Sequence, residues 1–317
     1  MMLNSQSLPP LITIVGPTAV GKTATSLSLA LRFSGEIISA DSRQFYCGMD
    51  IGTAKATVEE QATVPHYMLD VCQPTDNLTL AEFQEQAYRH AADITVRRKI
   101  PFLVGGTGLY VRAVVEGYGI PRVPPDEVLR KKLFAFADKF GCDALHERLI
   151  EVDPEAATRI DARNVRRVIR GLEVYEKSGT PISVLQRKTP PPYQILQIGL
   201  IRARECLYER VDRRIDGMLK AGLVNEVKTL LDAGVQHDCP AMSALGYRET
   251  VAFLKGQMAT EEELAQEIGR NTRRFIRTQS NWFRKNDPRI HWFDLDHQPY
   301  EEIEAFVKEW LSKNGTR

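Results

Sequence analysis

The chain has 317 residues, of which 43% are hydrophobic and 26% charged, and these values are ordinary for a globular protein with a buried core. The formal net charge is only +1, so a nucleic-acid partner would have to be bound by basic residues gathered locally. The five cysteines are scattered, which argues against a disulfide scaffold and a zinc site. The first ten residues are polar, unlike a signal peptide, and no apolar run approaches the ~20 residues of a membrane span. These features predict a cytoplasmic protein.

The first hundred residues alternate between apolar runs and helical patterns. Residues 11–15, 36–40 and 101–104 are short apolar runs, and each is followed by a glycine or an aspartate. Residues 22–33 and 80–98 have helical patterns. This alternation predicts an α/β fold with a parallel sheet covered by helices on both faces.

Prolines at positions 121, 124 and 125 mark a change in the sequence. Residues 126–150 and 154–177 have helical patterns with no strand candidate between them, and Thr-Pro-Pro-Pro at 189–192 ends the stretch. Residues 194–201 then predict a strand that returns to the sheet, and helices follow at 204–231 and 261–285. We therefore expect an α/β core of residues 1–120 and 193–317, with a helical insertion domain at 121–192.

The first predicted strand leads into a phosphate-binding motif. Residues 16–23 read G-P-T-A-V-G-K-T, which fits the pattern G-x-x-x-x-G-K-[ST]. Gly16 and Gly21 allow the backbone N–H groups to turn toward phosphate oxygens, Lys22 supplies a charge, and the Thr23 hydroxyl can ligate magnesium. Average residue usage gives this pattern by chance in roughly one such chain in a hundred. The predicted phosphate site comprises Gly16, Pro17, Thr18, Ala19, Val20, Gly21, Lys22 and Thr23.

A carboxylate follows the second predicted strand, at Asp41. Ligands in open α/β sheets lie outside the carboxyl ends of the strands, so Asp41 is expected near the phosphate loop. A carboxylate repels phosphate, but it can accept a proton from an incoming nucleophile. It can equally cap the start of a helix, and its position alone leaves both roles open. The third strand ends at Gly105 without an acid, which argues against an ordinary ATPase.

Several motifs together resemble the tRNA dimethylallyltransferase (isopentenyltransferase) family, and they cover nearly the whole chain in order. Besides the phosphate loop they are A-D-S-R-Q-F-Y at 40–46, D-I-G-T-A-K at 50–55, G-G-T-G-L-Y at 105–110, D-P-E-A-A at 153–157, R-R-V-I-R-G-L-E-V-Y at 166–175, R-V-D-R-R-I-D-G-M-L at 210–219 and A-L-G-Y-R-E at 244–249. The resemblance implies a P-loop NTPase-like core. It also implies transfer of dimethylallyl from its pyrophosphate to N6 of adenine 37, in tRNAs that read codons beginning with U.

The resemblance also implies roles for individual residues. Asp41 matches the general base, Thr107 helps to hold the adenine, and Lys22 and Arg214 bind the pyrophosphate. Contacts with the tRNA anticodon stem-loop are implied for Asp41, Ser42, Arg43, Gln44, Thr107, Arg130, Arg166, Arg167, Arg170, Gly246, Tyr247, Arg248 and Arg277. Mg²⁺ at Thr23 is the expected cofactor, and the chain is expected to act as a monomer.

Two departures from the family pattern stand out. Residues 65–67 are Pro-His-Tyr where many members have Pro-His-His or Pro-His-Arg. Residues 277–279 are Arg-Thr-Gln where Lys-Arg-Gln is usual, which leaves one base where two are common. Arginines at 163, 166, 167 and 170, and at 270, 273, 274 and 277, nevertheless form two clusters at helical spacing. Such clusters suit phosphate groups, although each could also be a solvated helix face.

Two other functions fit the same motifs. A small-molecule or nucleotide kinase would use ATP on the same loop and would not respond to dimethylallyl pyrophosphate. A non-catalytic RNA-binding protein with a vestigial loop would bind tRNA equally well without Lys22. The missing acid after the third strand argues against the kinase, and the intact Gly-Lys-Thr and Asp41 argue against the vestigial loop.

Overall fold

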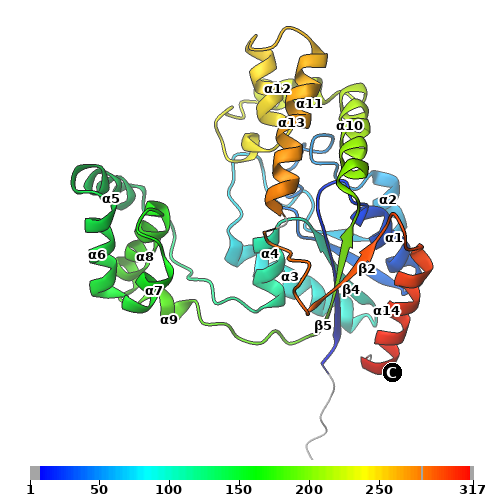
Figure 1. Cartoon of the computed structure of the whole chain (residues 1–317), viewed down its shortest axis with the longest axis horizontal. Coiled ribbons are helices and arrows are strands. Elements are labelled where there is room, and N and C mark those ends of the chain that lie inside the picture. The colour runs from blue at the N-terminus through cyan, green and yellow to red at the C-terminus, as the bar shows by residue number, and fades with distance from the viewer. Residues whose placement is uncertain (1–7, 280, 315–317) are drawn as a thin grey trace, which may run out of the picture. The chain divides into compact units, whose positions relative to one another are not determined.

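The structure is a computed structural model that describes residues 8–279 and 281–314. These residues form a six-stranded parallel sheet with strand order β3-β2-β4-β1-β5-β6, drawn in Figure 1. The strands are β1 (Pro10–Val15), β2 (Gly35–Ser39), β3 (His66–Tyr67), β4 (Ile100–Gly105), β5 (Gln194–Ile201) and β6 (Ile290–Asp294). The predicted parallel sheet is confirmed, and its four predicted strands match β1, β2, β4 and β5 to within one residue at each end.

Helices account for most of the remaining chain. Three of the predicted helices, at 126–150, 154–177 and 204–231, are each two helices. Glycines with positive φ separate two of these pairs, Gly141 (φ 91°) and Gly222 (φ 98°), and residues 160–164 separate the third. The helices are α1 (Lys22–Arg32), α2 (Val58–Thr63), α3 (Leu80–Val96), α4 (Gly108–Val115), α5 (Glu127–Phe140), α6 (Cys142–Val152), α7 (Pro154–Arg159), α8 (Val165–Ser178), α9 (Ile182–Leu185), α10 (Arg204–Lys220), α11 (Leu223–Asp232), α12 (Tyr247–Leu254), α13 (Glu261–Gln279) and α14 (Tyr300–Asn314), with a 3₁₀ turn at Ala241–Ser243.

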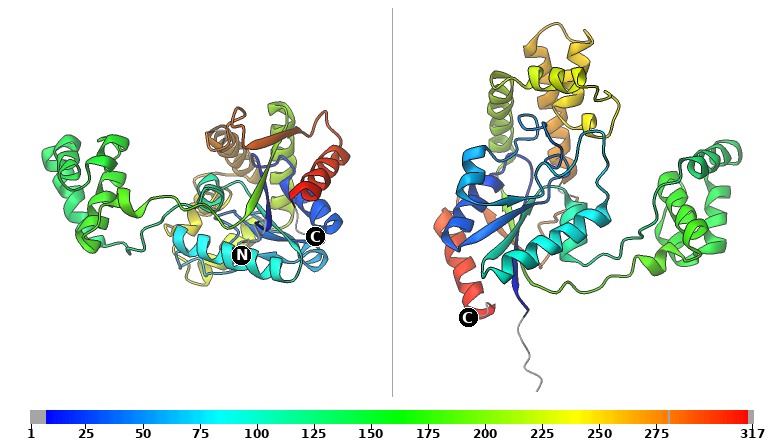
Figure 2. Two further views of the ribbon diagram at one scale, coloured as in Figure 1. Left: turned by 90° about the horizontal axis from the view of Figure 1, so that it is seen from below. Right: turned by 180° about the vertical axis from the view of Figure 1, so that it is seen from behind.

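Alternate residues of β1 face two separate apolar layers. Ile12 and Ile14 belong to a cluster with side chains of α1, α10, α13 and α14, whereas Leu11 and Val15 pack with α3 and α4. Helix α14 lies beside α1, where Arg32 pairs with Glu304 at 2.5 Å (Figure 2). The sheet is therefore covered on both faces, which explains why its strands are continuous apolar runs.

Residues Glu116–Pro190 form a compact unit of their own, and the rest of the chain forms the other. The unit contains α5 to α9 and no strand, and every one of its residues is described. Leu133, Leu145, Leu149, Val168 and Leu172 are buried against one another in its centre. In the parts of the chain that the structure describes, no helix is both long and apolar enough to cross a bilayer.

The sheet order explains where a site can form. Strands β2, β4 and β1 are neighbours, with Ser39 level with Val104, and Val15 level with Gly105. Because all are parallel, the loops after them emerge at the same edge. These loops are the phosphate loop after β1, the Asp41 segment after β2 and the Gly106-Thr107 segment after β4.

Candidate active site

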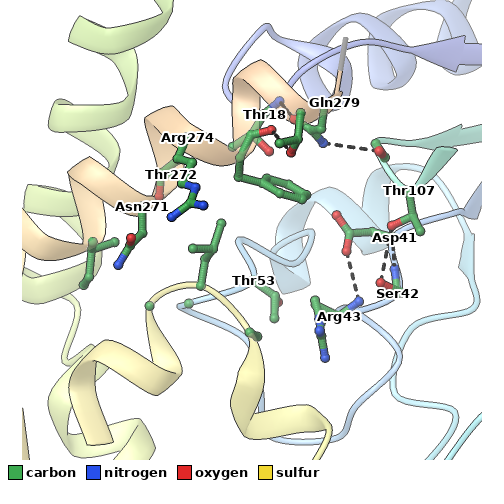
Figure 3. A pocket seen from close by; sticks show the side chains of 18 of the residues that line it. Thr18, Asp41, Ser42, Arg43, Thr53, Thr107, Asn271, Thr272, Arg274 and Gln279 are labelled. Carbon is green, nitrogen blue, oxygen red and sulfur yellow. Dashed lines mark hydrogen bonds between the residues drawn. The ribbon is translucent and has the colours of Figure 1, made fainter. Parts of the chain in front are cut away.

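A cavity of about 540 Å³ lies at this edge of the sheet (Figure 3). Its wall on the sheet side comes from the three loops, and the opposite wall comes from α10, α13 and the segment before α12. The side chains and backbone that line it include Thr18, Asp41, Ser42, Arg43, Gly106, Thr107, Val211, Arg214, Ile215, Met218, Gly246, Arg248, Ile268, Asn271, Thr272, Arg274, Phe275, Thr278, Gln279 and Trp282.

The phosphate loop has the backbone that its sequence predicts. Gly16 (φ 150°) and Gly21 (φ 119°) take positive φ, and a Cβ on Gly16 would lie 2.6 Å from the carbonyl oxygen of Leu200. The Lys22 ammonium donates to the carbonyl oxygens of Gly16 (3.0 Å) and Pro17 (2.9 Å). Of the eight predicted phosphate-site residues, Thr18 lines the cavity, and the Thr23 side chain is exposed.

Gln279, at the end of α13, joins two of the loops. Its Oε1 accepts from the Thr18 backbone N–H at 2.9 Å, and its Nε2 donates to the Gly106 carbonyl at 3.2 Å. A Cβ on Gly106 would lie 2.7 Å from this Nε2, so a larger residue there would displace the Gln279 amide. The family triplet at 277–279 includes Gln279 but does not predict this bridging role.

Three of the four predicted catalytic residues are electrostatically coupled. Burial lowers the pKa of Lys22 to about 8, while Asp41 acts to raise it and Arg214 to lower it. Burial also lowers the pKa of Arg214, and Asp41 opposes this. Arg214 donates to the Thr53 carbonyl at 3.4 Å. One carboxylate is therefore electrostatically coupled to two partly buried cations, which is the charge pattern expected around a pyrophosphate and a base.

Asp41 caps a turn and not a helix. Its Oδ1 accepts from the backbone N–H of Arg43 at 3.0 Å, and the residues that follow form turns. Thr107 lies alongside, where its Oγ1 accepts from the Ser42 backbone N–H at 3.1 Å and its hydroxyl donates to Ser42 Oγ at 3.4 Å (Figure 3). The loops after β2 and β4 are thus bonded to each other, and both residues line the cavity.

The other residues of the Asp41 motif differ in orientation. Arg43 lines the cavity and donates to the Pro240 carbonyl (2.7 Å) and to Ser243 Oγ (3.1 Å). The Gln44 side chain accepts from Ser39 Oγ (2.8 Å) and donates to the Ala54 carbonyl (3.1 Å). These bonds direct Gln44 into the protein, so its predicted contact with tRNA is not available to the side chain in this conformation.

The side chain of Tyr247 is likewise unavailable for the predicted contact with tRNA, whereas its neighbours Gly246 and Arg248 line the cavity. The Tyr247 ring is fully buried, and its hydroxyl donates to Glu226 Oε1 at 2.5 Å. The Glu226 carboxylate also accepts from the backbone N–H groups of residues 50, 51 and 52. Tyr247 therefore secures the segment that carries Thr53, and its ring cannot touch RNA without leaving the core.

In the helical unit, the predicted tRNA contacts fall into two classes. Arg130 and Arg170 pair with the buried carboxylate of Glu173, at 2.8 and 2.6 Å. Arg166 and Arg167 are exposed. Arg130 links α5 to α8, and Arg170 pairs with Glu173 within α8, because a buried carboxylate requires paired charges. Arg166 and Arg167 present their guanidinium groups to solvent.

The α13 arginines also differ from one another. Arg274 lines the cavity, and Arg277 is exposed and donates to the Tyr208 hydroxyl at 3.4 Å. Arg270 and Arg273 pair with Glu267 and Asp212. The predicted basic cluster is therefore partly neutralised by acids.

The apolar wall of the cavity was missed in the sequence. Val211, Ile215 and Met218 lie at helical spacing on the inward face of α10, and Phe275 of α13, 41% exposed, also lines the cavity. The 211-215-218 spacing was the available signal, but it is also the spacing of an ordinary core face.

A magnesium ion held by the phosphate loop would need few protein ligands. Within residues 8–279 and 281–314, no group of three or more His, Cys, Asp or Glu side chains could hold a metal. Mg²⁺ keeps several waters and binds through one or two protein oxygens plus substrate phosphates, so no such cluster is required. Thr23 remains the predicted protein ligand.

Comparison with known proteins decides the family. The model of the IPP transferase family matches residues 44–286. The chain belongs to the IPP transferase family. It is 47% identical to the tRNA dimethylallyltransferase of Thermomicrobium roseum over 96% of this chain and 93% of that protein. It is 51% identical to that of Roseiflexus castenholzii over 87% and 90%. The resemblance inferred from the motifs is confirmed.

Solved structures of the family have the same fold. The tRNA isopentenylpyrophosphate transferase of Bacillus halodurans is 43% identical and superposes with a TM-score of 0.71, covering 96% of this chain and 97% of that one. A eukaryotic dimethylallyltransferase acting on tRNA is 26% identical, with a TM-score of 0.82 and coverages of 98% and 81%. The predicted P-loop NTPase-like core with a helical insertion is confirmed.

Proposed function

We propose that the protein transfers a dimethylallyl group from dimethylallyl pyrophosphate to N6 of adenine 37, in tRNAs that read codons beginning with U, giving N6-(dimethylallyl)adenosine. The observation that carries this proposal is a single cavity bordered by the phosphate loop, Asp41, Thr107 and Arg214. The names of the relatives support the reaction class.

The exocyclic amine of adenine is a weak nucleophile because its lone pair is delocalised into the ring. Asp41 accepts a hydrogen bond from N6–H and takes that proton as the new C–N bond forms and the C–O bond to pyrophosphate breaks. The Arg43 N–H fixes one carboxylate oxygen of Asp41, which orients the other. Thr107 holds the base against Asp41.

Negative charge grows on the leaving pyrophosphate. The loop N–H groups, Lys22 and Arg214 stabilise that charge where it develops. Magnesium bound to the pyrophosphate, with Thr23 as its protein ligand, would neutralise part of the same charge. The apolar side chains of Ile215, Met218 and Phe275 provide a surface for the five-carbon group.

The acceptor must leave its stack to enter the cavity. Extruding a base costs a few kcal/mol, and least in a loop that is already single-stranded. Exposed Arg166, Arg167 and Arg277, with Arg274 at the cavity, suit the phosphates of an anticodon stem-loop. We expect a monomer to suffice, and we expect the cytoplasm as its compartment because all five cysteines are free.

The experiment is incubation with unmodified tRNA, magnesium and dimethylallyl pyrophosphate, followed by mass spectrometry of the nucleosides. A five-carbon addition to adenosine is expected, and a tRNA with guanine at position 37 should gain none. Phosphate transfer from ATP without prenylated adenosine would favour a kinase instead. The loop after β4, Gly106-Thr107, supplies no acid for that reaction.

A further inference from the structure

Two arginines contact the phosphate loop from outside the cavity. Arg210 Nε donates to the Ala19 carbonyl at 2.7 Å, and Arg202 Nε donates to the Val20 carbonyl at 2.9 Å. Neither arginine is among the residues that line the cavity. We call Arg202 and Arg210 the outer arginines.

The outer arginines determine which way two peptide groups face. In a trans peptide the C=O and N–H point in opposite directions. The Ala19 carbonyl shares its peptide with the Val20 N–H, and the Val20 carbonyl shares its peptide with the Gly21 N–H. With both carbonyls bonded outward, both N–H groups turn toward the inner side of the loop, where the Val20 N–H makes only a long 3.4 Å bond to the Pro17 carbonyl.

A cation bonded to a peptide carbonyl also polarises that peptide. Hydrogen bonds to charged donors are stronger than neutral ones, and bonds in a chain reinforce one another. Each outer arginine therefore strengthens the N–H on the opposite side of its peptide. Its positive charge acts on an anion in the loop without contacting the anion.

Arg202 is held rigidly in this place. It also donates to the Leu295 carbonyl (2.8 Å) and to Asp296 Oδ1 (2.6 Å), and Asp296 Oδ2 accepts from the Ala203 N–H at 2.6 Å. The side chains of Arg202 and Asp296 are only 20% and 15% exposed. The contact with Val20 is thus part of a fixed network.

Arg210 is positioned by the same helix that supplies Arg214 to the cavity. The two are four residues apart on α10, so they lie on neighbouring turns of one face. Burial, together with the charges of Arg202 and Arg213, lowers the pKa of Arg210. The Ala19 that it bonds has φ 66°, a left-handed conformation that is unfavourable for alanine and needs such support.

We propose that Arg202 and Arg210 are positioning residues for the pyrophosphate: they hold the Ala19 and Val20 carbonyls outward so that the following N–H groups bind the leaving group. This rests on the proposed function, in which a pyrophosphate occupies the loop. Arg214 acts from the cavity side, and the outer arginines act through the backbone.

The test compares R210Q with R213Q. Arg213 is on the same helix but is exposed, and among the described residues its Nε donates to the Glu209 carbonyl at 3.4 Å and not to the phosphate loop, so R213Q is a control with the same loss of charge. Calorimetry measures the Kd for magnesium pyrophosphate, and initial rates give separate KM values for the prenyl donor and for tRNA. R210Q should raise the pyrophosphate Kd and the donor KM about tenfold and leave the tRNA KM unchanged. R213Q should have the pyrophosphate Kd and the donor KM of the wild type.

Folding of each variant is checked by circular dichroism. If R210Q does not fold, R210K carries the test, with a loss of about threefold expected because lysine lacks the directed Nε–H. A folded R210Q with wild-type pyrophosphate Kd and donor KM, or an equal loss in R213Q, overturns the inference and leaves the proposed function intact. A wild-type enzyme that neither binds pyrophosphate nor prenylates tRNA overturns the proposed function itself.

Discussion

The backbone N–H of Arg43 donates to Asp41 Oδ1 at 3.0 Å, and this bond fixes the carboxylate at the edge of the cavity. A carboxylate held by its own turn has little freedom to swing toward the nearby cations Lys22 and Arg214. It can therefore remain a proton acceptor although two positive charges attract it. Activity should depend on the residues that hold this arrangement as well as on Asp41 itself.

Thr107 is the first of these residues. Thr107→Val removes the acceptor for the Ser42 N–H and the hydroxyl beside the adenine, while keeping the side-chain shape. We expect kcat to fall about tenfold or more, because one buried hydrogen bond of ordinary strength is lost. Thr107→Ser keeps the hydroxyl and should retain most activity. Steady-state rates on tRNA measure both, and equal rates for valine and threonine would contradict the role.

The pH dependence of kcat/KM for the prenyl donor should reflect the ionisation of Lys22. In the free enzyme its pKa is lowered to about 8, so the ammonium that attracts pyrophosphate is lost as pH rises through about 8. Because kcat/KM reports groups of the free enzyme, kcat/KM for the donor should fall above that pH. In Lys22→Arg the guanidinium stays charged, so the fall should disappear. If kcat/KM of this variant still falls above about pH 8 as in the wild type, another group is responsible for the fall.

Acid stability should depend on Glu36, far from the cavity at the start of β2. Burial acts to raise its pKa, but hydrogen bonds from Arg97, Lys99 and Tyr67 outweigh this and hold the pKa at about 2. Its stabilisation is complete above its ordinary value of 4.5 and is lost as pH falls toward 2. Glu36→Gln should lower the free energy of unfolding by about 2 kcal/mol at pH 7.

Urea denaturation at several pH values tests this. The difference between wild type and Glu36→Gln should shrink between about pH 4.5 and 2. A constant difference across that range would show that Glu36 contributes through packing and not through its charge.

Substitutions of the arginines in the helical unit should affect either tRNA binding or stability, depending on what each arginine contacts. Arg166→Ala and Arg167→Ala should each weaken tRNA binding and reduce the slope of log K against log salt by roughly 0.7 to 0.9, as for one lost phosphate contact. Arg170→Ala should mainly lower the Tm, because it leaves Glu173 with fewer partners. Binding titrations across a salt series, with thermal melts, measure both. Identical salt slopes in all three variants and the wild type would remove α8 from the RNA interface.

Much of the site could be predicted because it depends on local sequence and sheet topology. The phosphate loop is fixed by glycines that permit positive φ. Asp41 follows β2 and Thr107 follows β4, and β4 lies between β2 and β1 in the sheet. Parallel strands bring such loops to one edge whatever the rest of the chain does. The strands β3 and β6 escaped prediction, because β3 has only two residues and β6 contains His291 and Asp294, so neither is a continuous apolar run.

Side-chain orientation could not be predicted in the same way. Nothing in the sequence pattern distinguishes Arg170, which pairs with buried Glu173, from exposed Arg167, because burial is a property of the packed helices. Family resemblance placed Tyr247 at the RNA, yet its ring is buried against Glu226, a residue more than twenty positions away. The ends of α5 and α10, by contrast, could have been predicted from Gly141 and Gly222, because glycine is common just after the last residue of a helix.

The central claim is that Asp41 takes the proton from the adenine amine in the same cavity that binds the pyrophosphate. Single-turnover transfer by Asp41→Asn, with exposed Asp232→Asn as the matched control, tests it most directly. Asp41→Asn should lose on the order of 10²–10⁴ in rate while its Kd for magnesium pyrophosphate does not increase, and Asp232→Asn should be unaffected. Transfer by Asp41→Asn at near the wild-type rate would contradict the account.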